Sequence, residues 1–154
     1  ALGAFGIGLT EFAPAGLLPG IAAEFAVSEG TSGWVVGAYA LAVAVGAIVM
    51  SLLTAGRDRA RVLRLLVAVF VVGNLVTTVA PSFGLLLTGR VIAALCHGAY
   101  VGISAALAAE LLPEGRKAKG VAMVFSGITL AIVLGLPIGN LLGNPIQHFL
   151  FFCF

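Results

Sequence analysis

Residues 84–110 read GLLLTGRVIAALCHGAYVGISAALAAE, a run of 27 residues that is apolar at most positions. An α-helix of this length is about 40 Å long at 1.5 Å per residue, which is enough to cross the roughly 30 Å hydrocarbon core of a bilayer. The run contains two basic side chains, Arg90 and His97. It therefore predicts a transmembrane helix that carries a permanent cation and an imidazole inside the membrane.

The rest of the chain has the same apolar character. Of its 154 residues, 61% are hydrophobic and only 9% are charged, and the mean hydropathy is +1.19. Soluble domains contain about 25% charged residues, so a water-soluble fold is excluded, and a net charge of +2 gives no reason to expect nucleic-acid binding. We expect an all-α membrane protein with five transmembrane helices, at approximately 1–23, 34–55, 62–80, 84–110 and 119–142.

The connectors between these segments predict the orientation of the chain. GRDRARVLR (56–64) contains four arginines and one acid, and PEGRKAK (113–119) contains three basic residues and one acid. The other two connectors contain no Lys or Arg. Because connectors rich in Lys and Arg stay on the cytoplasmic side, we expect residue 1 to lie in the cytoplasm and the segments to alternate from there.

Three ionisable residues lie well within the predicted spans, and two of them have similar depths. Glu11 precedes the outer end of its helix by about a dozen residues, or roughly 18 Å, and His97 follows the outer start of its helix by a similar distance. Arg90 lies two turns, or about 10 Å, nearer the outside on the same helix face as His97. Such residues are normally turned inward and paired. We therefore infer a polar cavity between segments 1–23 and 84–110, with Glu11 and His97 within reach of each other or of a common water.

This arrangement has a functional and a structural interpretation. Burial disfavours the charged form of a carboxylate and a nearby cation favours it, so Glu11 beside Arg90 could load and unload a proton. Alternatively, Arg90 extends toward the outer interface and His97 bonds a carbonyl oxygen. An intramembrane enzyme is not expected, because Ser104 lies about 10 Å along the helix from His97. Four other polar residues are expected mainly to satisfy local hydrogen bonds: Tyr39, Asn74, Tyr100 and Asn140.

Small residues and prolines predict how the segments pack and bend. Glycines are concentrated in every segment except 62–80, so we expect the other four to pack closely and 62–80 to face lipid. Pro14 and Pro19 interrupt the first segment just after Glu11, and GLPIG (135–139) interrupts the fifth. Because proline lacks a backbone N–H, these sites predict kinks, hinges or carbonyl groups freed toward a cavity.

Three stretches resemble a known family of exporters. IGLTEFAPAGLLPGIAAEFAVS (7–28) resembles the first helix and loop of the major facilitator superfamily, in the drug:proton antiporter branch that includes sugar-efflux (arabinose-efflux-like) and purine-nucleoside-efflux proteins. GRVIAALCHGAYVG (89–102) resembles its fourth helix, and GITLAIVLGLPIGNLLG (127–143) resembles the antiporter motif of its fifth. The family residues fall on Arg90, His97, Gly98, Gly127, Gly135, Pro137 and Gly139.

The resemblance implies part of a transporter with twelve helices in two six-helix halves. Residues 1–143 would form a partial N-terminal half, and 144–154 a divergent or truncated tail. The loop between the second and third helices would belong to a cytoplasmic gate; here Ala55 stands where the family usually has Asp, and Arg57, Asp58, Arg59 and Arg61 follow.

The function implied is proton-coupled efflux of a small solute such as a sugar, nucleoside or drug, across the bacterial inner membrane. Glu11 would carry the proton, Arg90 would tune it, and His97 would relay protons or contact substrate. No metal or cofactor is implied, and the missing C-terminal half would be needed for transport. The alternative is a non-functional remnant, or a membrane interaction module without transport of its own.

Overall fold

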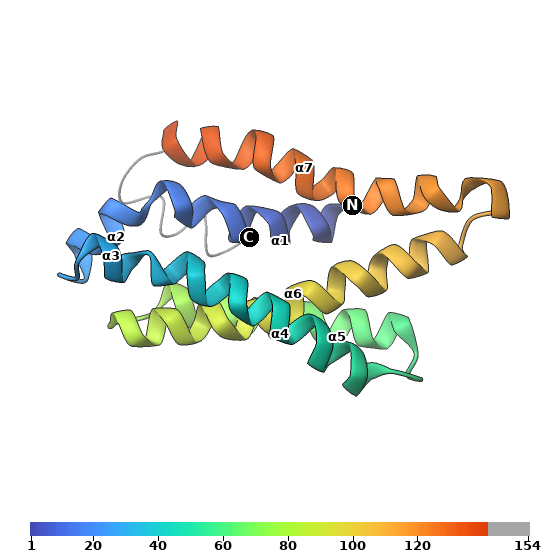
Figure 1. The fold of residues 1–154 in the computed structure, drawn as a ribbon, viewed down its shortest axis with the longest axis horizontal. Helices are drawn as coiled ribbons and strands as arrows, with labels where there is room; N and C mark the ends of the chain where they lie inside the picture. Colours follow the sequence, from blue (N-terminus) through green and yellow to red (C-terminus); the bar gives the residue numbers. More distant parts are fainter. Residues whose placement is uncertain (142–154) are drawn as a thin grey trace.

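The fold is a bundle of long helices that run roughly parallel or antiparallel to one another (Figure 1). The computed structural model describes residues 1–141, except for the side chains at positions 13, 135, 136 and 138–141. Two 3-10 helices, η1 and η2, accompany seven α-helices in this part of the chain. The elements are α1 (Leu2–Phe12), η1 (Ala13–Gly16), α2 (Leu18–Glu24), α3 (Glu29–Ser32), α4 (Trp34–Thr54), α5 (Arg59–Thr78), α6 (Phe83–Glu110), η2 (Glu114–Arg116) and α7 (Lys117–Leu141).

The predicted all-α membrane fold is confirmed. Among residues 1–141, four helical stretches are long and apolar enough to cross a membrane: Glu29–Thr54, Arg59–Thr78, Phe83–Glu110 and Glu114–Leu134. The first segment is not a straight span. Its two parts, Leu2–Gly16 and Leu18–Glu24, meet at an angle of 70° and together form a fifth candidate span. The bend follows Pro14, where sequence reasoning placed an interruption.

Short polar side chains mark where three of the helices begin. The Ser28 hydroxyl accepts a hydrogen bond from the backbone N–H of Thr31 at 3.1 Å. The Asp58 carboxylate accepts one from Arg61 N–H at 2.8 Å and so caps α5. Ser82 caps α6 in the same way, after Pro81 has prevented α5 from continuing. These caps fix the turns that bring successive spans side by side.

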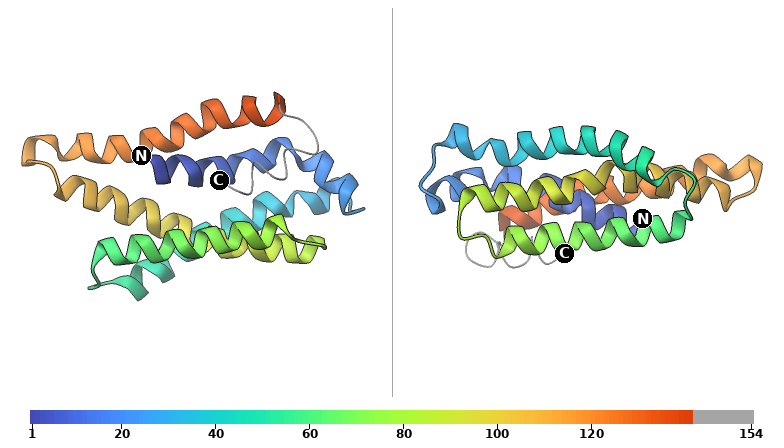
Figure 2. Two further views of the ribbon diagram at one scale, coloured as in Figure 1. Left: turned by 180° about the vertical axis from the view of Figure 1, so that it is seen from behind. Right: turned by 90° about the horizontal axis from the view of Figure 1, so that it is seen from below.

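The helices form two groups. α6 packs against α4 and α5, and α1 packs along α7; both views of Figure 2 show these neighbours together. A methyl group added at Gly46 of α4 would lie 2.5 Å from Leu95 Cα of α6, and one added at Gly73 of α5 would lie 2.6 Å from Ala93 N. Only glycine permits so close an approach of two helix backbones.

The expectation that residues 62–80 mainly face lipid was only half right. One face of α5 is exposed, but the other is buried against α6. Three residues in the sequence indicate this buried face: a single glycine, Gly73, and two polar residues that follow it, Asn74 and Thr77. Counting glycines per segment missed this contact, because one glycine placed opposite Ala93 is enough to bring two helices together.

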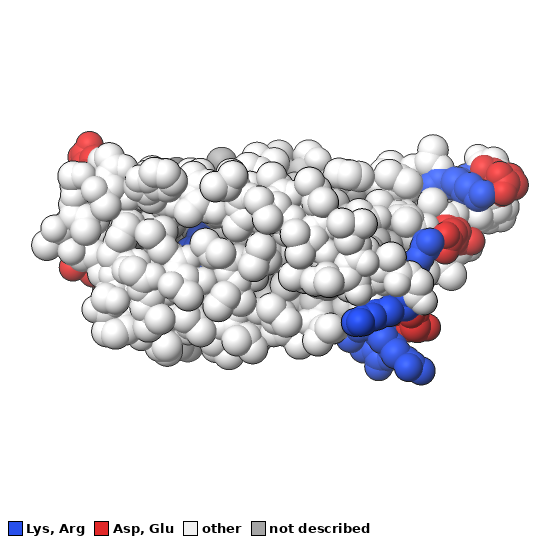
Figure 3. All heavy atoms as spheres, turned by 60° about the horizontal axis from the view of Figure 1, so that its bottom comes forward, with Lys and Arg blue, Asp and Glu red and all other residues white. Residues whose placement is uncertain are grey.

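Charged side chains are concentrated at the two ends of the bundle. Lys and Arg gather at one end, around the α4–α5 and α6–α7 connections, while the other end carries acidic residues (Figure 3). In between, the surface is almost entirely uncharged on the face shown. This distribution is that of a protein that crosses a bilayer with its basic connectors on one side.

Candidate functional site

Arg90 is the centre of the polar cluster inside the bundle. Its residue exposure is 0%, the lowest of any charged residue in the described chain. One guanidinium nitrogen, NH1, donates a hydrogen bond of 2.6 Å to the carbonyl oxygen of Thr10 on α1. The guanidinium carbon lies 4.1 Å from the centre of the Tyr39 ring on α4, a cation–π contact. Arg90 therefore joins three helices, and it does not extend to the interface as the alternative interpretation required.

The sequence explains why the Thr10 carbonyl is available to Arg90. In a regular α-helix, a carbonyl at position 10 accepts a hydrogen bond from the N–H at position 14. Position 14 is proline, which has no N–H. The α-helix accordingly ends at Phe12 and continues as the 3-10 turn Ala13–Gly16. Pro14 frees a carbonyl at this depth, and Arg90 is its donor.

Glu11 and His97 form the second part of the cluster. Glu11 Oε2 lies 3.7 Å from His97 Nε2, and His97 Nδ1 lies 3.3 Å from the Tyr39 hydroxyl. His97 is residue 15 of the 28 in α6, so the pair lies at the middle of that span. The contact between Glu11 and His97 is an ion pair when the imidazole is protonated, and its length leaves room for a proton to be exchanged through a small adjustment or a water.

Exposure differs sharply among these side chains. The His97 side chain is 7% exposed, whereas the Glu11 side chain is 26% exposed. Glu11 is thus the more accessible partner, whereas His97 and Arg90 are buried. If the Tyr39 hydroxyl donates to Nδ1, a neutral His97 carries its proton on Nε2, which faces Glu11. The arrangement can therefore pass a proton between an accessible carboxylate and a buried imidazole.

Arg90 has more donors than the described residues use. Its Nε and NH2 groups are buried and make no hydrogen bond within residues 1–141. Buried polar groups are rarely left unpaired, because desolvation without a partner costs about 1–3 kcal/mol per group. These two donors are available to an anionic or hydroxylated group that enters the cluster.

The basic turn between α4 and α5 was predicted to belong to a cytoplasmic gate, a role that remains a prediction. Its four charged residues do different things. Arg59 forms an ion pair of 2.6 Å with Glu110 at the end of α6, and Asp58 caps α5. Arg57 and Arg61 line a small cavity at the same turn.

The residues of the predicted antiporter motif lie on α7. Gly127 faces α1, since a methyl group there would lie 3.1 Å from Phe5 N. Pro137 is exposed and lies within a helix that continues to Leu141, so α7 is not divided at this point as α1 is. Gly135 and Gly139 belong to the same helix, and the hinge role of all three remains a prediction. The predicted tail, 144–154, lies outside the described residues.

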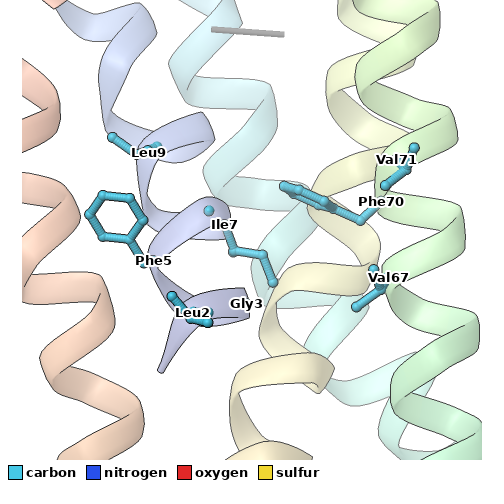
Figure 4. A pocket seen from close by; sticks show the side chains of 9 residues that line it. Leu2, Gly3, Phe5, Ile7, Leu9, Val67, Phe70 and Val71 are labelled. Carbon is cyan, nitrogen blue, oxygen red and sulfur yellow. The ribbon is translucent and has the colours of Figure 1, made fainter. Parts of the chain in front are cut away.

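A second pocket, apolar and of about the same volume as the cavity at the α4–α5 turn, lies away from the polar cluster, between α1 and α5. It has a volume of about 310 Å³ and contains no ionisable lining residue. Figure 4 shows Ile7 of α1 and Phe70 of α5 pointing toward one another across it. With only hydrocarbon side chains and glycines as its lining, this pocket offers nothing that could bind a proton or orient a polar solute.

Sequence reasoning missed two members of the cluster. Tyr39 was treated as a locally satisfied polar residue, although Tyr39, Ala42 and Gly46 share one buried face of α4 and this spacing was a usable signal. The Thr10 carbonyl was also missed, although Pro14 four residues later indicates an unpaired carbonyl at that position. The roles assigned to Glu11, Arg90 and His97 are untested by the geometry alone.

Long apolar spans, basic connectors at one end and a buried polar cluster at mid-depth define a multi-pass membrane protein of the transporter class. The sequence model of the Major Facilitator Superfamily matches residues 1–152. The chain belongs to this superfamily, whose members are transporters rather than enzymes.

Individual relatives agree with this assignment. The chain is 43% identical over 146 residues to the inner membrane transport protein YdhP of Escherichia coli (strain K12). This match covers 95% of this chain and 38% of that protein. It is 39% identical over 144 residues to the MFS-type transporter YtbD of Bacillus subtilis (strain 168), covering 94% and 36%. It is 34% identical over 147 residues to a probable sugar efflux transporter of Helicobacter pylori (strain G27), covering 96% and 38%. The chain thus spans well under half the length of these relatives.

Proposed function

We propose that this chain is the N-terminal part of a proton-coupled exporter of small polar solutes in the bacterial inner membrane. Names of relatives such as "inner membrane transport protein" and "probable sugar efflux transporter" support the location and the direction of transport. Together with a second half contributed by a longer polypeptide, the five spans form one wall of a central path. The N-terminus lies in the cytoplasm, as the basic connectors indicate.

The observation that carries the proposal is the contact of 3.7 Å between Glu11 and His97 at mid-depth. Glu11 is the proton-binding carboxylate, because its side chain is partly buried at mid-depth, remains 26% exposed and lies beside the His97 imidazole. When Glu11 loses its proton, its negative charge is stabilised by the cluster's cation, Arg90, and by a protonated His97. When Glu11 is neutral, this attraction disappears. The proton therefore changes how strongly α1 is attracted to α6.

In the same proposal, Arg90 is the residue that binds the substrate. Its Nε and NH2 groups have no partner within residues 1–141 and can donate to hydroxyl or phosphate-like oxygens of a solute. A sugar, a nucleoside or a polar drug presents such acceptors. Proton and solute then compete for one electrostatic cluster, which is the requirement for exchanging one against the other.

The test uses a chimera in which residues 1–141 are joined to the remaining part of the Escherichia coli relative. Efflux of labelled sugars and nucleosides is measured as uptake into inverted vesicles with an imposed proton gradient. We expect Glu11→Gln to abolish gradient-driven uptake and to leave membrane insertion unchanged, while Glu24→Gln, at the outer end of α2, retains it. Unchanged gradient-driven uptake in Glu11→Gln would refute the proposal. A chimera that inserts but moves no solute favours the alternative, a module without transport.

A further inference from the structure

The turn between α4 and α5 encloses a small cavity at the basic end of the bundle. Gly56 has a φ of +75°, a conformation that side chains disfavour, and it lets the chain reverse direction within a few residues. Asp58 then caps α5. The cavity has a volume of about 310 Å³ and is lined by Thr54, Arg57, Asp58, Arg61, Val62 and Leu65.

The three arginines of this turn differ in their partners. Arg59 is neutralised by Glu110 of α6 at 2.6 Å. Arg57 and Arg61 form no ion pair with any residue in the described range 1–141, and both line the cavity. The Asp58 carboxylate is already engaged by the Arg61 backbone N–H. Two cations and one anion therefore border the cavity, which carries net positive charge.

The other side of the cavity is apolar and faces outward. Leu65, which is 55% exposed, forms the outward part of this side, and Val62, which is 4% exposed, closes it toward the core. Next to it, Leu52 and Leu53 at the end of α4 are also exposed. The cavity thus lies where two membrane-spanning helices end and the basic connector begins, at the end of the bundle where Lys and Arg gather in Figure 3. A ligand that matches both sides has an anionic head and a hydrocarbon tail.

We propose that this cavity binds the phosphate headgroup of an anionic phospholipid from the leaflet that surrounds the basic end. Arg57 and Arg61 hold the phosphate, and the exposed Leu65 side chain contacts the first carbons of the acyl chains. Phospholipid phosphates lie at the level where transmembrane helices end, and basic pockets at this level bind anionic headgroups. A free phosphate ion would use the arginines but not the exposed leucine surface. This site is separate from the Glu11 cluster and does not depend on the proposed transport function.

The experiment measures lipid binding to the purified 154-residue chain by native mass spectrometry in detergent, with phosphatidylglycerol and phosphatidylcholine titrated separately. We expect the wild-type chain to bind phosphatidylglycerol at least tenfold more tightly than phosphatidylcholine. A basic residue in contact with an anionic headgroup contributes about fivefold in affinity, so Arg57→Gln with Arg61→Gln should weaken phosphatidylglycerol binding by ~25-fold. Phosphatidylcholine binding should be nearly unchanged.

The matched control is Arg116→Gln with Lys119→Gln, which removes the same charge from exposed residues of the other basic connector at the same end. We expect it to change phosphatidylglycerol binding by less than about twofold, since only the local charge at the cavity should matter. Equal losses in the two double variants would overturn the proposal. So would an absence of preference for phosphatidylglycerol in the wild type.

Two further arms complete the test. Circular dichroism reports whether the Gln variant is folded. Arg57→Lys with Arg61→Lys keeps both charges, so it should keep the preference for phosphatidylglycerol even if the Gln variant is poorly folded. Loss of this preference in the Lys variant contradicts the assignment. Inorganic phosphate at millimolar concentration should not displace the lipid. Displacement by phosphate would identify a free-anion site instead of a lipid site.

Discussion

The first and last helical segments of the described chain pack side by side and respond differently to proline; the first contains Pro14 and Pro19, and the last, α7, contains Pro137. In the first span, Pro14 ends α1 and is followed by a bend of 70° between the two parts. In the last, Pro137 lies inside α7, which continues to Leu141. The difference is the partner of the freed carbonyl. Thr10 has the buried Arg90 as a donor, whereas Pro137 lies on an exposed surface. In this bundle, the proline at which a helix ends is the one whose freed carbonyl accepts a hydrogen bond from another helix.

The largest effect on stability is expected when Arg90, the donor to the Thr10 carbonyl, is removed. We expect Arg90→Ala to lower the free energy of unfolding by about 3 kcal/mol, because it leaves a cavity and an unpaired Thr10 carbonyl. Detergent-induced unfolding followed by circular dichroism measures this. The control is Arg64→Ala, an exposed arginine on α5 that should cost less than about 0.5 kcal/mol. Similar losses in both variants would mean that Arg90 does not hold α1 in place.

A smaller change in the free energy of unfolding, of opposite sign, is expected when Pro137 of α7 is replaced. Proline in a helix interior is up to about 3 kcal/mol less favourable than alanine. Pro137→Ala restores the hydrogen bond to the carbonyl of Val133 and should raise the free energy of unfolding by about 2 kcal/mol. The same unfolding assay measures it. A destabilised Pro137→Ala variant would show that this proline is held by contacts that alanine cannot make, and the comparison between the two spans would fail.

The smallest net effect is expected for Pro14→Ala. The restored N–H would compete with Arg90 for the Thr10 carbonyl, so the gain in helix and the loss of a charged hydrogen bond nearly cancel, to within about 1 kcal/mol. The geometry should change more than the stability. Spin labels at Leu2→Cys and Gly20→Cys, with Cys96 and Cys153 replaced, should move apart as the bend of 70° opens. An unchanged distance would show that Pro14 does not maintain the bend.

Much of the fold followed from the sequence, because its causes are local. Apolar run length predicted the spans, and proline predicted the interruption at Pro14. Arg90 and His97 were placed on one face of one helix by spacing alone. Partners on other helices were harder to predict. The ion pair of Arg59 with Glu110 joins residues 51 positions apart, and no local pattern indicates it.

The polar cluster was predicted in part for the same reason. Depth arithmetic placed Glu11 and His97 at one level, since helix rise is constant. Tyr39 was not placed, because α4 is apolar on most of its surface and its inward face is marked only by the spacing of Tyr39, Ala42 and Gly46, which was not used. The burial of α5 against α6 was underestimated because one residue, Gly73, decides it. Interhelical contacts depend on a few positions, so the average composition of a segment does not reveal them.

The glycines at the helix contacts also determine which parts of the bundle can shift. Gly46 and Gly73 hold α4 and α5 in fixed register on α6, because sliding by one residue would drive a side chain into the neighbouring backbone. Gly8, whose added methyl would lie 2.9 Å from Ala131 Cβ, does the same for α1 and α7. The two bodies meet closely near the basic end, where Gly120 lies against Ala108. Gly3 of α1 likewise lies against Tyr100 of α6, so a shift of one body against the other would have to loosen contacts at both places.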